Sequence, residues 1–98
     1  MIILNARKQP WERKDYDADY QYWLADGDFV LTAAATVACL TSPADASLTI
    51  EVLDIRPSTV KAWLSGGTDK AKYKITIRAL TNAGRGIECE IVIAVKDD

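Results

Sequence analysis

The chain has 98 residues, of which 49% are apolar and 27% are charged. This length accommodates one folded domain, and the composition is that of an ordinary globular protein, which excludes global disorder. The formal net charge of −2 supplies no basic surface for phosphate groups, so we expect no nucleic-acid partner.

The amino-terminal sequence predicts a protein that is not exported. The apolar run 1–4 is followed by Arg7 and Lys8, whereas a signal peptide places positive charge before an apolar run of about 7–15 residues. No stretch approaches the ~18 apolar residues of a membrane span. We therefore expect a soluble protein made in the cytoplasm without a membrane partner. Cys39 and Cys89 are then expected to be reduced and buried, with a disulfide between them as the alternative.

Residues 1–14 are predicted to form an extended arm that leads into a first strand. Pro10 excludes regular helix around it. The stretch that follows alternates acidic with aromatic or small side chains at a period of two, in the order Asp15, Tyr16, Asp17, Ala18, Asp19, Tyr20. A turn is predicted at residues 26–28, where glycine lies between two aspartates.

The segment 29–40 is open to two interpretations. Its three consecutive alanines favour a helix, but its other residues are largely β-branched or apolar, and it contains no Glu, Lys, Arg or Gln for an outer helical face. A strand that is buried on one face is therefore favoured, with a helix as the alternative.

From residue 48 onward the chain alternates between apolar and polar side chains, as half-buried strands do. Segments 48–53 and 59–64 are separated by Arg56-Pro57-Ser58, and segments 72–79 and 87–95 by a glycine-containing hairpin turn. The expected inward residues are Leu48, Ile50, Val52, Val60, Ala62, Leu64, Tyr73, Ile75, Ile77, Ala79, Ile87, Cys89, Ile91, Ile93 and Val95. Across the last hairpin, Glu88 and Glu90 should lie near Lys74, Thr76 or Arg78.

Short strands separated by turns every 8–12 residues predict one all-β domain over residues 1–98, an antiparallel β-sandwich of about six or seven strands. Catalysis is not expected, because the chain contains no histidine for a Ser-His-Asp or Cys-His arrangement. Ser58 and Lys61 match an S-x-x-K spacing, but on a strand this spacing sends them to opposite faces. The run Asp15–Asp19 lacks the glycine and glutamate of a calcium loop. We therefore expect no catalytic residue, cofactor or metal.

The aromatic residues near the amino terminus are the candidate contact site. Some of the side chains of Trp11, Tyr16, Tyr20 and Trp23 are expected to face outward as anchors for a partner, because Trp and Tyr are enriched at interface hot spots, with Arg13 on the polar rim. The alternative is that these residues close one end of the core. Deletion of 1–14 is expected to weaken assembly and spare the fold.

The stretch from Trp63 to Tyr73 resembles the E-to-G region of immunoglobulin and fibronectin type III domains, in which a tyrosine corner opens an alternating strand. The residues that carry this resemblance are Trp63, Leu64, Gly66, Gly67, Thr68 and Tyr73. It implies an immunoglobulin-like sandwich.

A narrower resemblance rests on "KQPWERKDYDADYQYWLADGD", "VKAWLSGGT" and "YKITIRALTNAGR". These segments are similar to small tail-associated proteins of tailed bacteriophages and prophages described as fibre–tail adaptors. The resemblance implies a non-enzymatic virion structural protein that contacts other tail, fibre or connector proteins as a homo-oligomer. It would be found in the host cytoplasm during assembly and then in the virion. The alternative is a module that binds carbohydrate or a cell surface through Trp63 or Trp23.

Overall fold

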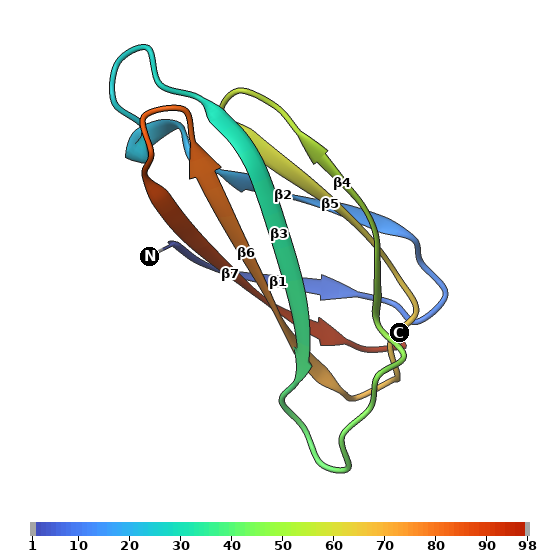
Figure 1. Cartoon of the computed structure of the whole chain (residues 1–98). Helices are drawn as coiled ribbons and strands as arrows, with labels where there is room; N and C mark the ends of the chain where they lie inside the picture. Colours follow the sequence, from blue (N-terminus) through green and yellow to red (C-terminus); the bar gives the residue numbers. More distant parts are fainter. Residues whose placement is uncertain (1, 98) are drawn as a thin grey trace.

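The computed structural model describes residues 2–97 and consists of strands joined by turns, with one short 3-10 helix, η1 (Gln21–Trp23). Figure 1 shows two layers of strands packed face to face. The strands are β1 (Ile2–Lys8), β2 (Lys14–Asp19), β3 (Val30–Cys39), β4 (Thr49–Ile55), β5 (Thr59–Ser65), β6 (Lys72–Thr81) and β7 (Gly86–Val95).

One sheet has the strand order β1-β7-β6-β3 and the other has the order β2-β5-β4. Seven strands in a four-plus-three sandwich confirm the expected all-β fold. One pairing departs from the antiparallel expectation, because β1 runs parallel to β7 from Ile2 opposite Cys89 to Lys8 opposite Val95. The parallel direction is permitted because the two strands come from opposite ends of the chain, and no tight hairpin joins them to require an antiparallel pair.

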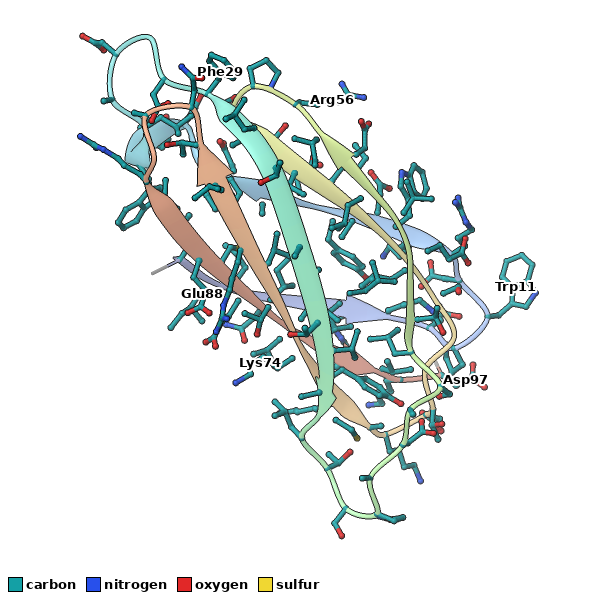
Figure 2. The ribbon with its side chains drawn as sticks, viewed as in Figure 1. Trp11, Phe29, Arg56, Lys74, Glu88 and Asp97 are labelled. Carbon is teal, nitrogen blue, oxygen red and sulfur yellow. The ribbon has the colours of Figure 1, made fainter. Side chains whose placement is uncertain are left out.

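The core lies between the sheets and is built mainly from the alternating strands β5, β6 and β7. Their inward side chains are buried as the period of two predicts: Val60, Ala62, Leu64, Tyr73, Ile75, Ile77, Ala79, Cys89, Ile91, Ile93 and Val95. The exception is Ile87, which is only partly buried. The cross-strand charge pairs also form, between Arg78 and Glu88 at 2.9 Å and between Lys74 and Glu90 at 3.5 Å. Figure 2 shows Lys74 and Glu88 on the outer side of this sheet.

Segment 29–40 is a strand, which confirms the favoured interpretation over the helical one. β3 pairs antiparallel with β6, and its inward side chains, such as Val37, pack against the core. The pairing with β6 outweighs the helical preference of the three alanines, because propensity is weak compared with tertiary packing.

β4 contradicts the expected alternation at one position. A register shift between Ile50 and Val52 marks a bulge against β5. The extra residue moves Leu53, rather than Val52, to the core side, so Val52 is exposed. A bulge adds one residue on one strand only, and the side chains beyond it change face.

The amino-terminal residues do not form a free arm. Ile2–Lys8 is an edge strand of the larger sheet, and Lys14 onward is β2 of the other sheet. What remains of the expected arm is the turn between β1 and β2. The expected strand-like character of residues 15–19 is confirmed. The arm expected over residues 1–14 is corrected, for the described residues from Ile2 onward, to one strand and one turn.

The two cysteines are unbridged in the structure. Cys89 is fully buried in the core, and burial raises the pKa of its thiol to about 11. Cys39 is partly buried near the end of β3. Within residues 2–97, no helix has the length and hydropathy that crossing a membrane requires.

Candidate interaction sites

The turn between β1 and β2 presents a tryptophan to solvent. Trp11 is 95% exposed, and Figure 2 shows its ring projecting away from the molecule. The turn itself is braced on both sides of this residue: the Glu12 amide donates to the Gln9 carbonyl at 3.1 Å, and the Gln9 amide donates to the Glu12 carboxylate at 2.7 Å. We call residues 9–12 the Trp11 turn.

A buried lysine fixes the base of the Trp11 turn. Lys8 is 2% exposed, and its ammonium donates to the carbonyls of Gln9 at 2.9 Å and of Gly66 at 2.6 Å, with a longer bond to Pro10 at 3.4 Å. Burial lowers the pKa of Lys8, and the carbonyl oxygens compensate part of the lost hydration. This residue therefore joins β1, the Trp11 turn and the turn after β5.

A basic cavity of about 220 Å³ adjoins the Trp11 turn. Its lining residues are Arg7, Lys8, Gln9, Glu12, Lys14 and Lys96. Four of these residues are cationic and one, Glu12, is a carboxylate. The cavity therefore favours an anionic group over a neutral or cationic one.

Arg13 and Trp63 meet on the outer face of the smaller sheet. The Arg13 guanidinium lies 4.4 Å from the centre of the Trp63 ring and forms an ion pair with Glu51 at 2.7 Å. Arg13 is thus placed as a surface residue, as expected for a rim. Because it covers one face of the Trp63 ring, that face is not available as a platform for a sugar.

Tyr16 and Tyr20 face the interior of the sandwich rather than solvent. Tyr16 is half-buried, and its hydroxyl donates to the Arg7 carbonyl at 2.8 Å; burial raises its pKa to about 12. Tyr20 is fully buried and donates to the Ile77 carbonyl at 3.1 Å. The expectation that Tyr20 is a contact residue is corrected, because the period of two on β2 places it on the same side as the buried Ala18.

A second exposed aromatic group lies at the other end of β2, on η1. Tyr22 is 86% exposed and Trp23 is 49% exposed. We call Gln21–Trp23 the η1 turn. A six-residue strand rises about 20 Å at ~3.3 Å per residue, so the η1 turn and the Trp11 turn lie at opposite ends of β2. Of the expected contact residues, the structure leaves Trp11, Arg13 and Trp23 at the surface, with Trp23 at the opposite end of β2 from the other two.

The expected tyrosine corner is present. The Tyr73 hydroxyl accepts a hydrogen bond at 2.9 Å from the Thr68 amide, five residues upstream, as the corner motif requires. Leu64 is buried, and Gly66 and Gly67 take positive φ angles in the turn between the strands.

Asp45 is a structural residue that the sequence analysis missed. Its carboxylate accepts hydrogen bonds from the hydroxyls of Tyr73, Thr68 and Ser47. It therefore fastens the loop between β3 and β4 to the tyrosine corner. Hydrogen bonds from Ser47, Thr68 and Tyr73 hold the pKa of Asp45 well below its usual range.

We call Asp45 with its three hydroxyl donors, Ser47, Thr68 and Tyr73, the Asp45 clamp. The clamp predicts that the folded state loses stability in acid. A carboxyl whose pKa is lower in the folded state stabilises the fold above its unfolded pKa of ~3.9, and this stabilisation is lost as the pH falls below that value. We expect the midpoint of thermal unfolding of Asp45→Asn to fall less between pH 7 and pH 3 than that of the unaltered protein. Asp26→Asn, in an exposed turn, should keep the unaltered pH dependence. If the midpoint falls by the same amount between pH 7 and pH 3 in Asp45→Asn and in the unaltered chain, the clamp contributes nothing to stability.

Two of the three aspartates of β2 form ion pairs, and the third, Asp19, accepts a hydrogen bond from the Gln21 amide at 3.0 Å. Lys61 lies 2.8 Å from Asp15 and 3.5 Å from Asp17 on the outer face of the smaller sheet. Among the described residues, no group of three Cys, Asp or Glu side chains is placed to hold a metal ion.

The fold and these surfaces define a small β-sandwich with exposed aromatic side chains on two of its turns. Residues 8–94 match the family model described as "Podophage GP4 fiber-tail adaptor protein gp77". The match spans most of the chain, so the chain belongs to this family. It is a phage tail structural adaptor, a non-enzymatic virion component that links tail fibres to the tail, which confirms the resemblance found in the sequence.

Two other comparisons add little. No curated protein matches the sequence. A solved structure of a Photobacterium sp. JT-ISH-224 2,6-sialyltransferase, in a complex with CMP and lactose, is similar with a TM-score of 0.49 and 11% identity. The similarity covers 98% of this chain but 18% of that one, and a likeness at this level carries no conclusion about function.

Proposed function

We propose that the adaptor joins two tail components through two separate aromatic sites, the Trp11 turn and the η1 turn. A protein that links two structures needs two surfaces that do not overlap. The two turns meet this need, since they lie at opposite ends of β2. The single observation that carries the proposal is the almost complete exposure of Trp11 on a braced turn.

The Trp11 turn is suited to insertion into an apolar pocket of a partner. Aromatic anchors contribute about 2–4 kcal/mol at the centre of an interface, and a turn already fixed by hydrogen bonds loses little further entropy on binding. The adjacent basic cavity favours a carboxylate on the partner, beside the pocket that takes the indole. Lys14 and Lys96 line this cavity together with Lys8, whose ammonium is bound to backbone carbonyls.

We further propose that this single domain assembles in the host cytoplasm and enters the particle in several copies. Each copy then presents one Trp11 turn and one η1 turn to the two tail components that it joins. A homo-oligomer of this kind matches the repeated, symmetric organisation usual for assemblies of one chain.

The test compares particles assembled with Trp11→Ala and particles assembled with Tyr22→Ala. A variant that has lost contact with the tail should yield particles lacking both adaptor and fibre, whereas a variant that has lost contact with the fibre should yield particles that keep the adaptor and lack the fibre. We expect each variant to give one of these two patterns, and the patterns to differ. A loss of 2–4 kcal/mol weakens binding by about 30- to 1000-fold.

The readout is the amount of adaptor and fibre protein per purified particle, measured by mass spectrometry against the capsid protein. Each variant serves as the control for the other, since both remove an exposed aromatic ring from a turn. Unaltered adaptor and fibre contents in both variants, or the same pattern in both, would contradict the two-site proposal.

A further inference from the structure

Four strands form the edges of the two sheets, and three of them carry features that discourage pairing with another chain. β1 contains Arg7 and the buried Lys8 and is followed by Pro10, and β2 carries alternating aspartates. β4 has a bulge, two acidic residues and Pro57 just beyond its end. Charges, bulges and prolines at edges are the usual protection against uncontrolled strand addition.

The fourth edge, β3, has less protection: its one irregularity in the pairing with β6 is a bulge at its start, between Val30 and Thr32. This strand is ten residues long, contains no charged residue and no proline, and forms its ladder with β6 alone in the sheet order. β4 lies beside it but forms its own ladder with β5. The register with β6 is regular from Thr32 to Cys39. An uncharged, regular edge of this length is a template for another strand.

The hydrogen-bond pattern identifies the backbone groups that face outward from this edge. The Leu40 amide donates to the Lys72 carbonyl at 2.8 Å, so in an antiparallel ladder every second residue back from Leu40 is directed toward β6. The intervening residues direct their backbone groups toward the open edge. These are Ala33, Ala35, Val37 and Cys39.

A groove runs along the carboxyl-terminal half of the same edge. It measures about 310 Å³ and is lined by Val37, Cys39, Ala44, Asp45, Ala46 and Leu48. Side chains of β3 that face the interior, including Val37 and Cys39, remain partly exposed because no further strand covers them. A strand added to β3 would place its own inward side chains over this mostly apolar groove.

We propose that β3 pairs with β3 of a second copy of this chain, antiparallel across a twofold axis, to join the two larger sheets. Such a contact is self-complementary, since each copy supplies the same edge. The outward side chains that would meet are small and uncharged: Thr32, Ala34, Thr36 and Ala38. No like charges oppose one another, whereas the charged edges β1, β2 and β4 would bring like charges together.

The test is a matched pair of lysine substitutions, Thr36→Lys on β3 and Thr76→Lys on β6. Thr36 and Thr76 are directly opposite each other on the outer face of the same sheet. The two variants therefore add the same charge to the same face. Thr36→Lys places it on the edge strand, and Thr76→Lys places it on the neighbouring strand. Lysine at the edge should oppose its symmetry mate and raise the dissociation constant of the dimer by at least about tenfold. Thr76→Lys should leave it within about twofold.

Sedimentation equilibrium of the full chain over a range of concentrations measures the dissociation constant, and urea unfolding confirms that both variants fold. A chain that stays monomeric at every concentration would overturn the pairing, as would a Thr36→Lys variant that associates as tightly as the unaltered chain. If both lysine variants weaken the dimer equally, the contact lies on the face of the sheet and not at its edge, and the proposed β3 pairing is wrong. Trp11→Ala should leave this association unchanged, so failure of the pairing is separable from failure of the adaptor contacts.

Discussion

Removal of residues 1–8 should leave a chain that is largely unfolded at room temperature. The deletion takes away β1, exposes the edge of β7, and removes the buried ammonium of Lys8 that holds the Gly66 carbonyl. It also takes away the carbonyl of Arg7 that accepts the Tyr16 hydroxyl. Losses of this kind amount to several kcal/mol, and a small domain has a total stability of about 5–15 kcal/mol. Urea unfolding followed by circular dichroism measures the effect.

A matched pair of substitutions separates loss of the strand from shortening of the chain. Ala6 lies opposite Ile93 and packs against the core, whereas the neighbouring Asn5 is exposed. Ala6→Asp should destabilise the fold by about 2 kcal/mol, because it places a charge against apolar side chains. Asn5→Asp should change stability by no more than about 0.5 kcal/mol. If the shortened chain unfolds at the same urea concentration as the full chain, β1 is a free arm after all.

The sequence was sufficient to predict the strands that carry the core. On β6 and β7 every second residue is apolar, so the inward face, the hairpin between them and the pairing of Arg78 with Glu88 all followed from the period of two. The same alternation in residues 15–20 also indicated that Tyr20 is buried. If Asp15, Asp17 and Asp19 face water, then Tyr16, Ala18 and Tyr20 must face the core, and the grouping of aromatic residues by sequence position concealed this.

The features that escaped prediction depend on contacts between distant parts of the chain. β1 has no clear alternation, and its partner β7 is at the other end of the sequence. The Asp45 clamp joins residues that are 23 and 28 positions apart, and no local pattern marks it. The exposure of Trp11 depends on the turn that Gln9 and Glu12 close, which composition alone could not distinguish from a buried position.

The second large effect is expected at Gly66, and Gly27 supplies its control. Both glycines have a φ angle of +78°, a conformation that costs a residue with a side chain about 1–2 kcal/mol. A Cβ atom at Gly27 would meet nothing within 4 Å, whereas a Cβ atom at Gly66 would lie 2.2 Å from the backbone carbonyl oxygen of Ser47. The two positions therefore share the backbone strain and differ in the steric clash.

Gly66→Ala should consequently destabilise the fold by about 3–5 kcal/mol, and Gly27→Ala by about 1 kcal/mol. The clash is with backbone, so a side-chain rotation cannot relieve it, and the chain between β3 and β4 must move. That movement would disturb the Asp45 clamp, because Ser47 is one of its donors, and the bond from Lys8 to the Gly66 carbonyl. The difference between the two urea midpoints measures the clash directly. Equal costs at Gly66 and Gly27 would mean that the loop carrying Ser47 is not packed against this turn, and the tyrosine corner would then lack the clamp that fixes it.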